Sequence, residues 1–219
     1  MDRLIELDSL FWEATRETLG IVAATLLIGG VAGLVLGLLL HTTRPGGIAP
    51  NRVVHVVLNL LVNFFRPIPF VIFIAAAQPA ARLVVGTGIG NPAIIFALSV
   101  AAAFGISRIV EQNLVSVDPG VLEASRAMGA GRLRTTLTVL LPEALGPLIL
   151  GYTFALVAIV DMSAVASVVG GGGLGSFALT YGYRQYEPVV TWAAVLLIVA
   201  LVQVCQFAGN RLARTAMRR

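Results

Sequence analysis

The sequence predicts an all-α polytopic membrane protein with about five transmembrane helices, and three observations lead to this fold class. Of its 219 residues, 58% are hydrophobic. Only 12% are charged, which is about half the share found in soluble domains. Several apolar runs are long enough to cross a bilayer as a helix, which takes about 20 residues. Together these observations exclude a disordered chain, a basic nucleic-acid-binding domain and an ordinary soluble enzyme.

The N-terminal segment, residues 1–18, predicts a short amphipathic helix at the external membrane surface. Its apolar residues fall on one helical stripe, made of Leu4, Leu7, Phe11 and Ala14. A secretory signal peptide needs a basic start, a short apolar core and a cleavage site. This start is net acidic, and the apolar run after it is long enough to span a membrane. We therefore expect an external segment that is separate from the first span, not a signal peptide.

Two spans are predicted in the first part of the chain. The first, 19–40, is uncharged and has Gly29, Gly33 and Gly37 at four-residue spacing, which lets helices approach closely. The second, 53–77, is interrupted by the sequence Arg66-Pro67-Ile68-Pro69. Two prolines this close together break the hydrogen bonds of a regular helix. We therefore predict a kink near Arg66.

Three further spans are predicted, at 92–107, 144–169 and 189–207. Asn91 and Pro92 are typical of a helix cap followed by a first-turn proline. Arg108 ends the third span and can pair with Glu111 one turn further on. The glycine-rich stretch 170–175 lets the chain turn tightly where the fourth span ends.

The distribution of arginine predicts the orientation of the chain. With five spans the termini lie on opposite sides, so the loops 41–52 and 108–143 share a side with the basic tail, 210–219. That side has ten arginines and the other side has four: Arg44, Arg52, Arg108, Arg126, Arg132, Arg134, Arg211, Arg214, Arg218 and Arg219 against Arg3, Arg16, Arg82 and Arg184. Because cytoplasmic loops are rich in basic residues, we expect an external N-terminus and a cytoplasmic C-terminus in a bacterial cytoplasmic membrane.

The cytoplasmic stretch 118–142 predicts a helix–turn–helix elbow. Asp118 can cap a first helix that begins with proline, and Gly129 can end it. A second helix, about Arg132–Leu141, is stopped by Pro142. Leu122, Ala127 and Met128 would give the elbow an apolar surface suited to docking into a groove on a soluble partner. The alternative is a plain connector between spans, and a DNA-reading role does not suit an elbow tethered to a membrane.

The elbow resembles the "EAA" signature of permease subunits of binding-protein-dependent ABC importers. That signature is Glu-Ala-Ala, three residues, Gly, nine residues, Ile, any residue and Leu-Pro. The chain has Glu123-Ala124-Ser125, then Gly129, then Val139 and Leu141-Pro142 at the same spacings. The departures are Ser125 for alanine and Val139 for isoleucine. The resemblance implies a coupling helix that docks on the ATPase subunit through Glu123, Ala124, Ser125, Arg126, Ala127, Met128 and Gly129.

Nearly the whole chain resembles one branch of this family, the methionine-importer permeases. Matching stretches include Phe65 to Phe70, Leu140 to Leu145, Gly172 to Gly175 and Gln206 to Gly209. The resemblance implies the type I importer fold over residues 19–209. It also implies a permease homodimer with two ATPase subunits and an external lipid-anchored substrate-binding protein. Methionine, or another small amino acid, would cross the membrane by alternating access.

Charged residues inside the predicted spans are candidates for the translocation path. Asp161 in the fourth span is costly in lipid, so it should face protein or water. We assign Asp161, Met162, Ser163 and Arg66 to the path, with helix packing as the alternative for Asp161 and interfacial placement as the alternative for Arg66. A proton-coupled secondary transporter would use such residues, although no inverted repeat is visible. A membrane scaffold without transport and an importer for a different solute stay open as well.

The chain lacks the sequence features of an ATP- or metal-binding enzyme. It has no lysine, and no stretch matches the phosphate-binding loop Gly, four residues, Gly-Lys-Ser/Thr. Its one cysteine, Cys205, is expected to be a small buried hydrophobe, and no Cys/His spacing suggests a metal site. We expect a non-catalytic subunit that binds no cofactor and no nucleic acid, with ATP-Mg on the partner ATPase.

Overall fold

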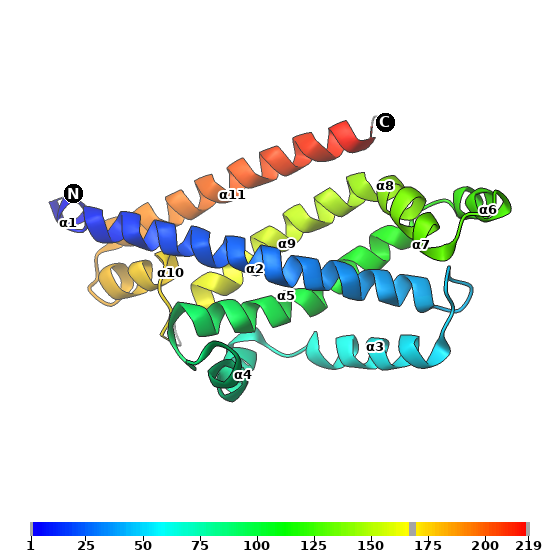
Figure 1. Cartoon of the computed structure of the whole chain (residues 1–219). Coiled ribbons are helices and arrows are strands. Elements are labelled where there is room, and N and C mark those ends of the chain that lie inside the picture. The colour runs from blue at the N-terminus through cyan, green and yellow to red at the C-terminus, as the bar shows by residue number, and fades with distance from the viewer. Residues whose placement is uncertain (1, 167–169, 218–219) are drawn as a thin grey trace.

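The computed structural model describes residues 2–166 and 170–217, and every regular element within them is a helix (Figure 1). Four helices are long and apolar enough to cross a membrane, and a fifth crossing is possible if one bent pair counts as a span. The four are α2 (Asp8–Thr43), α5 (Gly90–Val115), α9 (Leu145–Ala166) and α11 (Pro188–Met217). The bent pair is α3 (Arg52–Phe65) and α4 (Phe70–Val85). The predicted all-α class with about five spans is confirmed.

The N-terminal segment is not separate from the first span, which corrects the predicted boundary at residue 18. A short helix, α1 (Asp2–Glu6), leads directly into α2, which begins at Asp8. Leu7 and Ala14 are buried together with Leu174 and Val190 from later elements. Leu7, Phe11 and Ala14 of the amphipathic stripe therefore pack against protein, and this packing stabilises the start of α2.

Two other helices run past their predicted ends. Helix α5 continues two turns beyond residue 107, to Val115, because Arg108 and Glu111 are partnered there and do not require bulk water. Helix α11 continues through the predicted basic tail as far as Met217. Residues 167–169 of the fourth predicted span and residues 218–219 of the tail lie outside the described residues.

The second predicted span is two helices that meet at an angle of 113°. Helix α3 ends at Phe65, with Arg66 as its C-terminal cap, and α4 begins after Pro69. The predicted break near Arg66 is confirmed, because neither proline can donate a backbone hydrogen bond. The predicted end at residue 77 is wrong, since α4 continues through Pro79 to Val85. In Figure 1, α4 runs across the direction of the long helices.

Helices α2 and α5 pack with their backbones close together along the glycine stripe. A Cβ atom added to Gly33 would lie 2.7 Å from Ile106 Cβ, and one added to Gly37 would lie 2.6 Å from Val110 Cβ. At Gly29 it would lie 2.7 Å from the carbonyl oxygen of Ser99. Only glycine fits at such a distance, so the predicted close helix packing is confirmed.

A group of side-chain hydrogen bonds joins the N-terminal part of α2 and the first turn of α5 to the glycines that follow α9. Glu17 on α2 accepts hydrogen bonds from the Gly173 N–H at 2.8 Å and from Asn91 Nδ2 at 3.0 Å. Asn91 Oδ1 in turn accepts from the Gly172 N–H at 2.9 Å. The predicted capping role of Asn91 is wrong, because its amide is used in this contact and α5 begins one residue earlier. Beyond the glycines come two short helical elements that we did not predict, α10 (Leu174–Phe177) and the π-helix η3 (Ala178–Tyr183).

Candidate functional site

The first elbow helix, α6 (Pro119–Ala127), is bounded as the sequence predicts. Asp118 Oδ1 accepts a hydrogen bond from the Gly120 N–H at 2.7 Å. At the other end the Gly129 N–H donates to the Arg126 carbonyl at 2.9 Å, and the Ala130 N–H donates to the Ser125 carbonyl at 3.1 Å. This pair of bonds is a Schellman motif. It needs a left-handed residue, and Gly129 supplies it with φ +79°.

The second elbow helix does not stop at Pro142, which corrects that prediction. It consists of α7 (Arg132–Thr135), the π-helix η1 (Thr136–Leu140) and α8 (Leu141–Glu143), and α9 begins at Leu145. Pro142 has no N–H for the α-helical bond to Thr138, and its ring crowds that carbonyl group. The wider π-turn before it relieves this crowding. The elbow is therefore joined to α9 by an almost unbroken helical path.

Contacts inside the elbow hold its two halves together and attach it to the α2–α3 connection. The hydroxyls of Ser125 and Thr135 lie 3.2 Å apart, and both residues are buried. Leu122 belongs to the same buried cluster as Ile48 of the α2–α3 connection. Arg126 Nη2 donates to the Gly47 carbonyl of that connection at 3.3 Å. We did not predict Thr135 or Ile48 as supporting residues, because no spacing rule pairs residues across the turn at Gly129.

The outer face of α6 is exposed in the single chain. Of the seven predicted coupling residues, six are exposed and Ser125 is buried. Met128 is 82% exposed. Leu122, predicted to be part of this apolar surface, is buried instead. The exposed face therefore combines an apolar side chain with the charges of Glu123 and Arg126, a composition that suits a protein partner.

The predicted path residues do not form one cluster. Arg66 is exposed at the end of α3, and Asp161 is exposed on α9. Met162 is half-buried and packs against the buried cluster that includes Ile74. Ser163 is buried, and its hydroxyl donates to the Val160 carbonyl at 2.7 Å. Within the described residues, no hydrogen bond or ion pair joins any of these predicted path residues to another.

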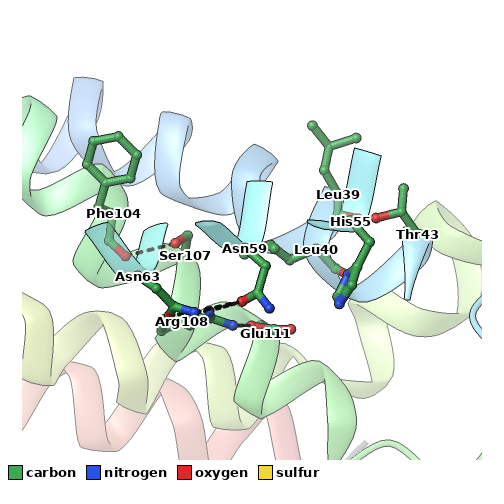
Figure 2. Close-up of polar contacts among 10 residues, drawn as sticks. All are labelled: Leu39, Leu40, Thr43, His55, Asn59, Asn63, Phe104, Ser107, Arg108 and Glu111. Carbon is green, nitrogen blue, oxygen red and sulfur yellow. Dashed lines mark hydrogen bonds and ion pairs between the residues drawn. The ribbon is translucent and has the colours of Figure 1, made fainter. Parts of the chain in front are cut away.

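A polar network joins α3 to α5 (Figure 2). Arg108 Nη1 pairs with Glu111 Oε2, which confirms the predicted ion pair, and both side chains are only 16% exposed. Arg108 Nη2 donates to Asn59 Oδ1 and, at 2.6 Å, to Asn63 Oδ1. The two asparagines lie one turn apart on α3, so both face the same guanidinium group. We did not predict this contact between helices.

Two more contacts lie along the inner face of α3. His55 Nδ1 lies 3.1 Å from the Leu40 carbonyl of α2. The ring of Phe65 stacks on that of Phe104, with centroids 4.7 Å apart and planes 2° from parallel. Together with the asparagines, these residues make the inner face of α3 polar near its start and aromatic at its end.

The described part of the chain contains no group of three or more His, Cys, Asp or Glu side chains that could hold a metal ion. Cys205 is exposed on α11, and our prediction that it is buried was wrong. The reason is that the apolar run around it forms a helix with one face turned away from the rest of the chain.

Comparison with known proteins places this architecture among transport proteins. The family model for binding-protein-dependent transport system inner membrane components matches residues 29–218. The D-methionine transport system permease protein MetI of Escherichia coli (strain K12) is 41% identical over 215 residues, which covers 97% of this chain and 99% of that protein. A probable D-methionine transport system permease protein MetI of Vibrio cholerae is 38% identical over 205 residues, covering 94% and 91%.

A solved structure agrees with these relatives. A chain of the MetNI methionine ABC transporter, described as inward facing, is 41% identical to this chain and superposes on it with a TM-score of 0.93. The match covers 96% of this chain and 98% of the other. The chain therefore belongs to the family of inner membrane components of binding-protein-dependent transport systems, and it is a multi-pass protein of the inner membrane.

Proposed function

We propose that this chain is the membrane-spanning subunit of an ATP-driven importer that passes methionine across the cytoplasmic membrane by alternating access. The observation that carries the proposal is the elbow, with its signature spacing, its closed turn and its exposed outer face. The substrate assignment is supported by relatives that are named for methionine transport and align over almost their full length. Family membership favours this importer over a proton-coupled secondary transporter.

The working assembly contains two copies of this chain, two ATPase subunits that hold ATP-Mg, and an external lipid-anchored binding protein. The name of the structural neighbour supports the ATPase partner, and the name of the family supports the binding protein. This chain performs no covalent chemistry. Its part is to exist in two arrangements and to change between them when its partner ATPases bind and hydrolyse ATP.

In our proposal the elbow faces the cytosol and the N-terminus lies outside. Figure 1 supports this orientation, because the elbow and the C-terminus lie at one end of the bundle and the N-terminus lies at the other. The Arg126–Gly47 bond brings the α2–α3 connection to the elbow end. The segments that contain most of the arginines thus share one end, as the positive-inside rule requires of a cytoplasmic side.

The exposed face of α6 docks on the ATPase in this mechanism. Motion of the docked elbow reaches the membrane by two routes. One runs through α7, η1 and α8 into α9. The other runs through Arg126 and the buried cluster that contains both Leu122 and Ile48 to the α2–α3 connection.

Asp161 and Arg66 are our candidates for polar points on the path. Both are exposed in the single chain. A charge in contact with lipid at the centre of a span costs about 2.5–3.5 kcal/mol on an insertion scale, so each should face water or the second copy of the chain. Met162 and Ser163 stay candidates beside Asp161; in the single chain Met162 is half-buried and Ser163 is buried.

The experiment is uptake of labelled methionine by cells with and without this gene, together with Gly129→Asp and Gly131→Asp variants. Gly129→Asp puts an acidic side chain at φ +79°, a backbone conformation that residues with a side chain rarely adopt, whereas Gly131 has φ −67° and precedes α7 as its N-terminal cap, where aspartate is favoured. Both changes add the same charge to the same turn. We expect uptake to be lost on deletion and in Gly129→Asp, and to be retained in Gly131→Asp.

Either of two results would contradict part of the proposal. If deletion leaves methionine uptake unchanged, the substrate assignment is wrong, and co-purification of an ATPase subunit then decides whether the importer architecture stands. If Gly129→Asp transports normally while present at normal levels in the membrane, the elbow does not couple the two subunits.

A further inference from the structure

We propose that Asn59, Asn63, Arg108 and Glu111 form a releasable catch that holds α3 against α5 in one arrangement of the transport cycle. The catch is defined by the two asparagines on α3 and the ion pair on α5 (Figure 2). This inference rests on the proposed function, because it concerns how the chain changes between two arrangements. Three of the four residues make the contact between the helices: Asn59 and Asn63 on α3, and Arg108 on α5.

Apolar packing holds α3 only weakly. Val62 is its one buried residue, and Val53, Leu60 and Phe64 are 73%, 65% and 67% exposed. In a bilayer, lipid contacts satisfy such a face, so apolar surface alone gives no drive for two helices to associate. Interhelical hydrogen bonds and close ring contacts decide the association instead. The catch and the Phe65–Phe104 stack are therefore the main attachment of α3 to α5.

Each half of the catch keeps a partner when the halves separate. Arg108 and Glu111 lie on the same helix and remain paired if α3 moves away. On α3, Asn63 Nδ2 already donates to Asn59 Oδ1 at 3.3 Å. A buried ion pair split between two helices would leave an uncompensated charge on opening, which is strongly unfavourable. Here only hydrogen bonds to neutral amides are lost, so the catch can open at modest cost.

The ends of α3 allow it to move as a unit. Its far end stops at the 113° bend before α4. Its near end is joined to the α2–α3 connection, which Arg126 of the elbow contacts through Gly47. Motion of the elbow therefore reaches α3 directly. Since the catch is closed here, in a structure that resembles an inward-facing neighbour, we infer that it opens when the ATPases close on ATP.

The test uses two variants that change the catch in opposite directions. In the purified complex with its ATPase, in lipid nanodiscs, Asn59→Leu/Asn63→Leu removes the acceptors for Arg108. Asn59→Asp replaces a neutral acceptor with a carboxylate and strengthens the contact. Val57→Leu, on the exposed face of the same helix, is the matched control. Spin labels at Val53→Cys and Val115→Cys, in a Cys205→Ser background, report the separation of α3 and α5 with and without a non-hydrolysable ATP analogue.

We expect the wild type and Val57→Leu to separate only with nucleotide. The leucine pair should raise the separated population without nucleotide by about fivefold to tenfold, the effect of two interhelical hydrogen bonds in a membrane. With nucleotide bound, Asn59→Asp should lower the population in which α3 and α5 are separated, by a similar factor. Methionine uptake in proteoliposomes should fall in both, and ATP hydrolysis without substrate should rise in the first and fall in the second.

If the four residues only stabilised the fold, the leucine pair and Asn59→Asp would change the distance between the spin labels in the same direction. The catch is overturned if the two variants shift the label distance in the same direction, or if neither shifts it relative to Val57→Leu. If the wild-type complex transports no methionine, the proposed function fails, but the label distances still decide the catch. If the leucine pair does not fold, the smaller nucleotide-dependent separation expected in Asn59→Asp decides whether the catch exists.

Discussion

Helix α5 contacts its two neighbours in opposite ways. Along α2 the backbones approach so closely that a single added carbon atom at Gly33 or Gly37 would overlap a side chain of α5. Along α3 the contact consists of one guanidinium group, two amides and one ring stack. A close-packed seam has one arrangement, because shifting it creates both overlaps and voids. A contact made of polar groups that have alternative partners can exist in two arrangements, closed and open. We therefore expect α2 and α5 to form the rigid unit and α3 to be the helix that moves.

The largest expected effect is at the rigid seam. Gly33→Leu places a branched side chain where a Cβ atom would already lie 2.7 Å from Ile106 Cβ. Overpacking destabilises by about 1–3 kcal/mol, and a branched side chain at this distance should lie at the upper end of that range. Thermal unfolding in detergent should therefore occur at a clearly lower temperature, and the yield should fall. Gly20→Ala, at a helical glycine with no atom within 4 Å of the added carbon, is the control and should be neutral or slightly stabilising, because alanine is the better helix former. Equal unfolding temperatures for the two variants would show that the seam is not close-packed.

A smaller effect is expected when the ion pair of the catch is broken. Arg108→Leu leaves Glu111 largely buried, with its side chain 16% exposed and without its partner, and should destabilise by about 2 kcal/mol. The double variant Arg108→Leu/Glu111→Leu removes the orphan carboxylate and should recover a large part of that loss. Thermal unfolding of the single and double variants measures the difference. Simple addition of the two single effects would mean that the residues do not interact.

The smallest effect is expected at the ring stack. Phe65→Ala removes the stacked contact with Phe104, at a centroid distance of 4.7 Å, and such a pair contributes about 1 kcal/mol beyond the buried area. Phe64→Ala removes a ring that is 67% exposed and that touches Phe65 only edge to face, with centroids 5.3 Å apart, and it should have a smaller effect. The two unfolding temperatures are compared in the same detergent. A larger loss in Phe64→Ala would place the important contact on the outer face of α3, against our interpretation of that helix as weakly packed.

Features that depend on a few neighbouring residues could be predicted from the sequence. Asp118 and Gly129 bound the first elbow helix because an N-cap oxygen and a left-handed glycine act on backbone groups within a few residues. The break at Arg66 follows from proline chemistry in the same way. The pairing of Arg108 with Glu111 needs only helical spacing. Each of these predictions is confirmed because its cause and its effect lie within one turn or one loop.

Features that depend on contacts between distant segments were missed or misplaced. The helix α2 begins eleven residues before the predicted span because Leu7 and Ala14 pack on elements more than 150 residues away. Asn91 looked like a cap, but it binds Glu17 and Gly172 instead. Pro142 looked like a stop, but a π-turn lets the helix continue into the membrane. Composition also could not predict that the amides of Asn59 and Asn63 on α3 would accept hydrogen bonds from Arg108.

The sequence by itself determined the fold class, the number of spans, the elbow and the family to which the chain belongs. These follow from hydropathy, local backbone chemistry and fixed spacing, which act over short distances along the chain. Only the tertiary structure decided which helix faces pair, that the backbones of α2 and α5 lie close together, and that α3 contacts α5 through polar groups and one ring stack. The physical reason is that in lipid the apolar faces are interchangeable, so helix pairing is set by close backbone approach and by the few polar side chains that find one another in three dimensions.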